Sequence, residues 1–328
     1  VAMTPSDSEF RMTYRFLGNS GLLVSKLSLG SWMDVSDSYT ADAWYEMMKL
    51  AFQHGVNFFD NSEVYGGGLA EKNMGTAIKK GTTEGIWSRE DLVITTKIFF
   101  GSKGFAAKCG PNEQGLSRKH IIEGTKASLK RLELEYVDVI FCNRADPHTP
   151  IEETVRAMNY VIDQGWSFYW GTSHYNILDR NKVDFEYIDL YKKYKLGLTT
   201  WSPLAFGALT GKYSAGTPEG SRLSSDLWKA FAPDFADRVA KADKLRPVAD
   251  KLGISMAELA LAWCVSNENV STVMIGAKTL TQLEQNLKAI EVVDKITADI
   301  KAEIDELVPF SPELPKPDAL EMVHEQHL

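Results

Sequence analysis

Three residues, Asp60, Tyr65 and Lys97, lie in two short segments whose composition could support acid–base chemistry. Residues 58–66 and residues 92–97 each begin with an apolar run and end in polar side chains, which predicts a buried strand with its chemistry at the carboxyl end. A tyrosine hydroxyl alone, with a pKa of about 10, is a weak acid. A neighbouring ammonium favours the phenolate and lowers that pKa. The three residues together therefore predict a proton donor that works near neutral pH.

Such a donor suits the reduction of a carbonyl group, which takes a hydride at carbon and a proton at oxygen. In this interpretation Tyr65 is the general acid, Lys97 tunes its pKa, and Asp60 keeps the lysine charged. Each residue alone has an ordinary alternative: Asp60 could cap a helix, Tyr65 could pack in a core and Lys97 could lie in solvent. Their joint placement at the ends of two predicted strands favours chemistry.

The elements that must position these residues alternate along the chain. Residues 18–21, between two apolar runs, predict an N-terminal β-hairpin. Strands are expected at residues 27–30, 56–60, 92–97, 137–142, 168–172, 197–201 and 271–275. Helices are expected at residues 40–54, 70–80, from Ser117 onward, 151–164, 280–289 and 297–307. This alternation predicts an α/β fold with a parallel sheet covered by helices, and 328 residues suit one (β/α)8 TIM barrel.

The expected domain organisation is simple, but the strand count falls short of a complete barrel. Residues 1–12 form an N-terminal extension, residues 13–310 a single barrel domain and residues 311–328 a C-terminal tail. Only seven inner strands can be counted, and the missing βα unit, around strand six, would follow Ser173. Either the chain carries a true deletion or the sequence lacks a segment that the protein contains. We favour the second explanation, because an open barrel exposes unpaired strand edges.

Composition excludes several classes of protein. A net charge of −8 argues against a nucleic-acid binder, which would be basic. Three widely spaced cysteines, with no Cys-x-x-Cys pattern, support neither a disulfide framework nor a zinc site, so no metal is expected. We see no signal peptide and no apolar run long enough to span a bilayer, so we expect a cytoplasmic protein without direct membrane insertion.

Longer stretches of the chain resemble a known family. The matching segments are residues 58–65, 115–124, 134–139, 149–158, 169–173, 200–205 and 209–213. They are similar to the aldo-keto reductase superfamily and, within it, to the β-subunits of shaker-type voltage-gated potassium channels and their plant and microbial relatives. The likeness covers about residues 14–307. It implies an eight-stranded barrel that binds NADPH or NADP+ without a Rossmann fold and uses an Asp-Tyr-Lys-His tetrad.

The resemblance places Asp60, Tyr65 and Lys97 in the first three positions of that tetrad and Asn143 in the fourth. Most members of the superfamily have histidine there, whereas the channel β-subunits have asparagine. An amide can donate a hydrogen bond to a carbonyl oxygen but cannot be protonated. We therefore expect slow turnover with a tightly held cofactor.

Cofactor contacts follow from the same match. The residues expected to bind NADP(H) are Ser31, Trp32, Asp60, Ser173, Trp201, Ser202, Pro203, Leu204, Ala205, Gly207, Lys212, Arg222, Gly276, Lys278, Gln282, Gln285 and Asn286. Three of them, Lys212, Arg222 and Lys278, could supply the cations that a 2′-phosphate prefers. Gln285 departs from the glutamate usual at its position.

Two functions agree with this resemblance. The first is NADPH-dependent reduction of a small-molecule aldehyde or ketone. The alternative is a regulatory subunit that binds a potassium channel α-subunit and uses its nucleotide as a redox sensor. By analogy with the channel-type members, we expect a homotetramer.

Overall fold

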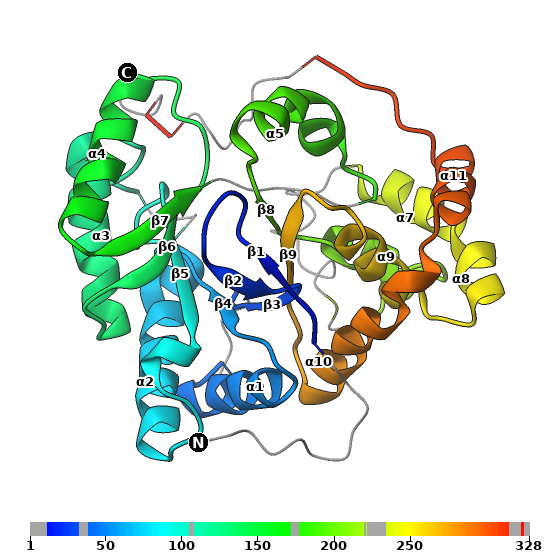
Figure 1. Ribbon diagram of the computed structural model, residues 1–328, viewed down its shortest axis with the longest axis horizontal. Coiled ribbons are helices and arrows are strands. Elements are labelled where there is room, and N and C mark those ends of the chain that lie inside the picture. Colours follow the sequence, from blue (N-terminus) through cyan, green and yellow to red (C-terminus); the bar gives the residue numbers. More distant parts are fainter. Residues whose placement is uncertain are drawn as a thin grey trace. The chain divides into compact units, whose positions relative to one another are not determined.

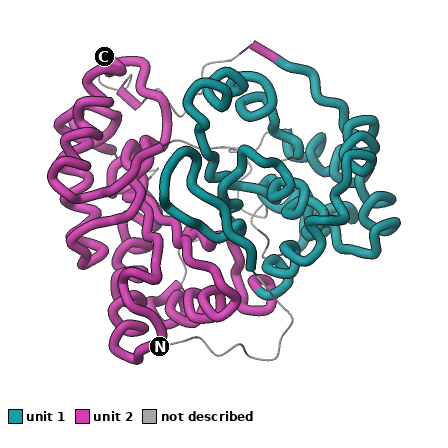
Figure 2. The backbone as a smooth tube through the Cα atoms, viewed as in Figure 1, with its two compact units in different colours: residues 1–27, 174–275, 284–312 teal, residues 28–173, 276–283, 313–328 magenta. Residues whose placement is uncertain are grey.

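The computed structural model describes residues 12–32, 39–104, 108–171, 177–219, 221, 234–314 and 323–324. The chain divides into two compact units (Figure 2). Unit 1 comprises Val1–Leu27, His174–Ile275 and Glu284–Pro312. Unit 2 comprises Ser28–Ser173, Gly276–Leu283 and Glu313–Leu328. Of the residues named above, Ser173, Arg222 and residues 1–11 lie outside the described part of the chain.

Five parallel strands in consecutive order dominate unit 2 (Figure 1). They are β3 (Leu27–Gly30), whose first residue belongs to unit 1, β4 (Phe58–Asp60), β5 (Val93–Ile98), β6 (Val137–Cys142) and β7 (Ser167–Gly171). Every residue of β4, β5 and β6 is buried. Their apolar and β-branched residues favour strands that are covered on both faces. Because the strands are parallel, their carboxyl ends meet at one edge, where side chains from different strands can converge.

Four helices alternate with these strands: α1 (Ala41–Gln53), α2 (Leu69–Thr83), α3 (Arg118–Leu132) and α4 (Ile151–Asp163). Consecutive helices pack against one another, α1 on α2, α2 on α3 and α3 on α4. The hydroxyl of Ser117 accepts a hydrogen bond from the His120 N–H at 3.2 Å, which confirms the predicted start of α3. Two short 3-10 turns, η1 (Tyr65–Gly68) and η2 (Arg89–Asp91), precede α2 and β5.

Unit 1 contains the predicted hairpin, formed by β1 (Tyr14–Phe16) and β2 (Leu23–Ser25), and the parallel pair β8 (Leu198–Thr200) and β9 (Val270–Ile275). The Lys26 carbonyl, just after the hairpin, accepts a hydrogen bond from the Val273 N–H of β9 at 2.9 Å. The helical elements are η3 (Lys182–Glu186), α5 (Ile188–Tyr194), η4 (Ala205–Thr210), α7 (Phe235–Asp243), α8 (Arg246–Leu252), α9 (Met256–Val265), η6 (Lys288–Lys295) and α11 (Ala298–Leu307). Helix α10 (Leu280–Leu287) begins in unit 2 and ends in unit 1.

The fold class agrees with the prediction: an α/β protein with parallel strands, covering helices and an N-terminal hairpin. All seven predicted inner strands are present in the described part of the chain, from β3 to β9. Helices α5, α7, α8 and α9 were not predicted. Helix α9 is buried at eight of its ten positions, so its sequence is apolar around the whole helix and lacks the stripe that marks an amphipathic helix.

Candidate active site

The register of β4 and β5 brings two of the predicted catalytic residues to one edge of the sheet. Asp60, the last residue of β4, pairs with Thr95 of β5. Side chains two positions apart on a strand share a face, so Thr95 and Lys97 point to the same side. The Thr95 hydroxyl donates a hydrogen bond to Asp60 Oδ1 at 2.7 Å. The pairing of β4 with β5 therefore places Lys97 beside the Asp60 carboxylate.

Lys97 and Asp60 form a buried ion pair. Their side chains are 3% and 4% exposed, and the Lys97 ammonium donates to Asp60 Oδ2 and, at 2.8 Å, to the Asn61 carbonyl. A buried charge requires a partner and hydrogen bonds, because desolvation otherwise costs several kcal/mol. The lysine is thus held charged at the carboxyl end of β5.

Tyr65 reaches the same place from the turn that follows β4. Three glycines in succession, Gly66, Gly67 and Gly68, have φ angles of +59°, +63° and +85°, a conformation that residues with a Cβ rarely adopt. The chain therefore makes a tight turn directly after Tyr65. It folds the Tyr65 side chain back over the strand ends, where the centre of its ring lies 4.9 Å from Lys97 Nζ.

The phenol is buried and in contact with both a cation and an aromatic ring. Tyr65 is 9% exposed, and its ring lies against the Lys97 ammonium. Trp32, which follows β3, stacks on the Tyr65 ring with centroids 5.7 Å apart and planes at 8°. Asp60, Tyr65, Lys97 and Trp32 thus converge at the carboxyl ends of β3, β4 and β5.

Burial and charge act on Tyr65 in opposite directions. Burial raises the pKa of Tyr65 above its usual 10.0, while Lys97 and Arg144 lower it and Asp60 raises it. The net direction is upward, so the sequence-based expectation of a lowered pKa was wrong for this site: Lys97 acts in the expected direction, but desolvation outweighs it. For Lys97, burial lowers the pKa, yet Asp60 and Tyr65 together raise it above 10.5. At neutral pH the phenol is protonated and the amine charged.

Asn143 directly follows β6 and is half-buried. Its backbone N–H donates to the carbonyl of Ile98, the last residue of β5, at 3.2 Å. The fourth predicted tetrad position therefore lies beside the strand end that carries Lys97. The next residue, Arg144, is a functional candidate that the sequence analysis missed, because no motif distinguished it from a surface arginine.

Predicted cofactor residues in unit 2 differ in their exposure. Ser31, at the end of β3, is 1% exposed, and its Oγ has no hydrogen-bond partner among the residues that the structure describes. A buried hydroxyl without a partner suits a polar ligand group. Gly276, Lys278 and Gln282 are exposed, and the Gln282 side chain caps the Lys278 N–H at 2.9 Å.

In unit 1, residues 201–207, which include expected cofactor contacts, follow β8 in a strained conformation. Ser202, Ala205 and Phe206 have φ angles of +55°, +48° and +57°. Such backbone conformations cost about 1–3 kcal/mol each and cluster at functional sites. Lys212, beyond the loop, is exposed; farther along the chain Gln285 is exposed and Asn286 is buried.

The described residues contain neither a candidate metal site nor a candidate membrane span. No group of three or more His, Cys, Asp or Glu side chains there could hold a metal ion. No helix in the same part of the chain has the length and apolar character needed to cross a membrane.

Comparison with known proteins identifies two similar plant proteins. One, from Arabidopsis thaliana, is 45% identical over 335 residues, covering 93% of this chain and 99% of that protein. The other, from Oryza sativa subsp. japonica, is 43% identical over 331 residues, covering 92% and 98%. Both are named probable voltage-gated potassium channel subunit beta.

The same comparisons support a missing segment. Since 93% of 328 residues is about 305, roughly 30 of the 335 positions aligned with the Arabidopsis protein have no residue in this chain, about the length of one βα unit. The model of the aldo/keto reductase family matches residues 26–183 and again residues 173–309. The two matches overlap where the sequence predicts the missing unit. Together they cover most of the chain, which therefore belongs to the aldo/keto reductase family.

Proposed function

We propose that this protein reduces aldehydes or ketones to alcohols with NADPH. The observation that carries the proposal is the convergence of the Asp60–Lys97 ion pair on the buried phenol of Tyr65. NADPH, when bound, supplies the hydride. Tyr65 then donates its proton to the carbonyl oxygen, and Lys97, held charged by Asp60, stabilises the phenolate that remains.

Asn143 fits the role of a hydrogen-bond donor to the same carbonyl oxygen. Its amide carries no proton that it can lose near neutral pH, so it orients the substrate without supplying charge. We therefore propose that turnover is slow compared with family members that have histidine at this position.

The proposed cofactor is NADP(H). In unit 2 two residues fit groups of a dinucleotide: Ser31, whose buried hydroxyl has no partner among the described residues, fits a polar group, and the exposed Lys278 fits an anionic group. In unit 1 the loop after β8 has a strained backbone of the kind that clusters at functional sites. The full proposed set also contains Trp32, Asp60, Ser173, Trp201, Ser202, Pro203, Leu204, Ala205, Gly207, Lys212, Arg222, Gly276, Gln282, Gln285 and Asn286.

The test replaces the phenol alone. Tyr65→Phe should abolish NADPH oxidation by an aldehyde such as 4-nitrobenzaldehyde while retaining NADPH binding, measured by fluorescence titration. Tyr136→Phe is the matched control, because Tyr136 lies next to the amino end of β6, away from the catalytic edge. Normal turnover by Tyr65→Phe would show that the acid is another group.

A second function has support from the names of the two relatives, both probable potassium channel β-subunits. In that role the protein would be a cytoplasmic homotetramer that binds a channel α-subunit and senses redox state through its nucleotide. Pull-down with the cytoplasmic domain of a shaker-type channel tests this role. Binding retained by Tyr65→Phe, alongside lost turnover, would separate the two functions; a source organism without such channels would argue against the second.

A further inference from the structure

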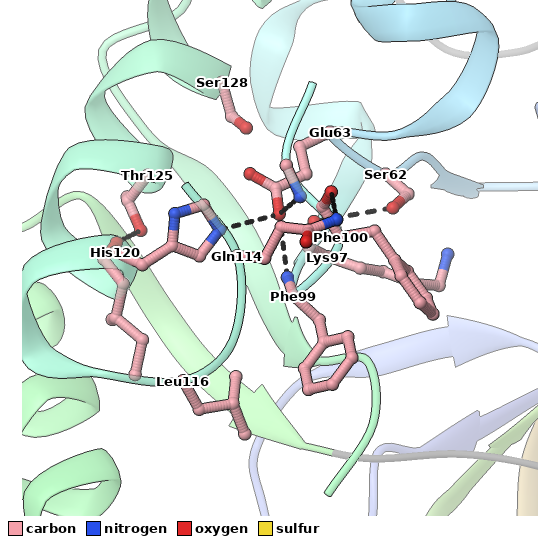
Figure 3. Close-up of polar contacts among 12 residues, drawn as sticks. Ser62, Glu63, Lys97, Phe99, Phe100, Gln114, Leu116, His120, Thr125 and Ser128 are labelled. Atoms are coloured by element: carbon pink, nitrogen blue, oxygen red, sulfur yellow. Dashed lines mark hydrogen bonds and ion pairs between the residues drawn. The ribbon is translucent and has the colours of Figure 1, made fainter. Parts of the chain in front are cut away.

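We infer that Glu63 is a positioning residue for the catalytic lysine, an inference that rests on the proposed function. Glu63 lies between Asp60 and Tyr65 in the chain, and its side chain reaches toward α3 and the segment after β5 (Figure 3). It is 2% exposed. A carboxylate at this depth requires strong hydrogen bonds, and the structure supplies three to a single oxygen.

The three donors to Glu63 Oε1 come from two elements. The backbone N–H groups of Phe99 and Gly101 donate at 2.7 and 2.8 Å. His120 of α3, itself 6% exposed, contacts the same oxygen through Nε2 at 3.1 Å (Figure 3). Glu63 therefore ties the segment directly after Lys97 to the helix behind it.

Helix α3 leaves space for the second carboxylate oxygen. A Cβ placed on Gly124 would lie 3.1 Å from Glu63 Oε2 and 3.3 Å from Ile98 Cδ1. Because residue 124 is glycine, α3 has no side chain where the Glu63 carboxylate and the end of β5 approach it. The close packing indicates that the helix accommodates Glu63 specifically.

The backbone of Glu63 also contacts Lys97 directly. The Glu63 N–H donates to the Lys97 carbonyl at 3.2 Å, and the Ser62 hydroxyl approaches the same carbonyl at 3.5 Å. One residue therefore holds Lys97 by its main chain and the residues after Lys97 by its side chain. Because Glu63 is two residues from Tyr65, this clamp fixes the tyrosine turn and the lysine strand relative to each other.

The other contacts to residues 99–101 do not replace the hydrogen bonds that Glu63 accepts. The Phe99 carbonyl accepts from the Gly115 N–H at 2.7 Å, and the Phe100 carbonyl accepts from the Gln114 side chain at 2.9 Å. Both involve carbonyl groups and a loop farther along the chain. Among the interactions recorded for the described residues, the N–H groups of Phe99 and Gly101 are satisfied by Glu63.

The experiment compares Glu63→Ala with Glu63→Gln and with Asp138→Asn. Asp138 is a matched control: it is also a buried carboxylate that accepts a β5 backbone N–H, that of Ile94 at 2.8 Å, but at the opposite end of the strand. Glutamine keeps an acceptor oxygen for the two N–H groups, so Glu63→Gln should retain more activity than Glu63→Ala.

We expect Glu63→Ala to lower kcat about tenfold to a hundredfold, with KM for NADPH and aldehyde within about threefold, because a small displacement of a catalytic group is costly. Asp138→Asn should leave kcat within about threefold at a temperature where both variants are folded. Hydrogen exchange at Phe99 and Gly101 should accelerate at least about tenfold in Glu63→Ala only. Equal losses of kcat in Glu63→Ala and Asp138→Asn would overturn the inference.

Hydrogen exchange tests the role of Glu63 independently of whether the proposed function is correct. If the wild-type protein reduces no carbonyl compound, the proposed function fails, whereas selective exchange at Phe99 and Gly101 still shows that Glu63 holds the end of β5. If exchange there is unchanged in Glu63→Ala, the inference fails whatever the activity.

Discussion

The ammonium of Lys97 lies 4.9 Å from the centre of the Tyr65 ring and is bonded at the same time to the Asp60 carboxylate. Lys97 therefore contacts two side chains: the Asp60 carboxylate and the Tyr65 phenol, which becomes an anion only when it loses its proton. This arrangement favours the phenolate without leaving the lysine unpaired while the phenol is neutral.

Removing the cation should cost stability as well as activity. Lys97→Met leaves Asp60 buried and unpaired, so we expect it to lower the unfolding free energy by about 3–5 kcal/mol. Adding Asp60→Asn removes that unpaired charge and should recover much of the loss, whereas aldehyde reduction stays absent in both variants. Urea denaturation followed by circular dichroism measures the effect. If the effects of the two substitutions on the unfolding free energy are strictly additive, the pair is not coupled. The exposed Lys80–Asp42 pair is the control, because Lys80→Met should change the unfolding free energy little.

The pH dependence of reduction follows from the direction of the Tyr65 pKa. The proposed reduction requires the protonated phenol, and burial raises the pKa of Tyr65 above 10.0. We therefore expect kcat for reduction to be flat through neutral pH and to fall only as the pH rises above about 10. The measurement is a pH–rate profile, with circular dichroism at each pH to confirm that the protein stays folded. A fall centred near pH 7 would instead mean that Lys97 outweighs burial.

Asn143 offers a test of the proposed slow turnover. Asn143→His introduces a side chain that can carry a positive charge beside the reacting oxygen, so we expect faster aldehyde reduction, by about tenfold or more. Steady-state kinetics with a fixed aldehyde gives the comparison, and Asn143→Ala shows what loss of the amide alone does. Unchanged or slower reduction by Asn143→His would count against this role.

The glycine turn after Tyr65 should be intolerant of any side chain. A Cβ at Gly68, where φ is +85°, would lie 2.8 Å from Arg131 Cδ. Gly85 has a φ of +70° but nothing within 4 Å of such a Cβ. Gly85→Ala should therefore cost about 1–2 kcal/mol from backbone strain alone, and Gly68→Ala more, with a loss of kcat because Tyr65 moves. Thermal unfolding and kinetics of the two variants test this, and equal costs would exclude a role for the Arg131 contact.

We expect the protein to become more stable when the missing βα unit is restored. Strand β7 has β6 as its one neighbouring strand in the described part of the chain, and Phe168 on β7 is 48% exposed. Inserting a βα unit of roughly 30 residues after Ser173 should cover this edge and raise the melting temperature. A glycine–serine linker of equal length is the control; if it stabilises as much, the edge is not a liability.

The sequence by itself determined the strands and the residue types of the candidate site. Alternating apolar runs predicted all seven inner strands, and the Ser117 cap marked the start of α3, because both signals are local in the chain. Helix α9 escaped prediction because it is buried nearly all round and so carries no periodic stripe.

Tertiary structure alone decided how the candidate site is organised. The stacking of Trp32 on Tyr65, the clamp that Glu63 forms on the end of β5 and the net upward direction of the Tyr65 pKa all depend on contacts between segments far apart in the chain. A pKa in particular is set by the balance of desolvation and charge at one point in space. Residue types and their spacing reveal the charges but not the depth at which they are buried.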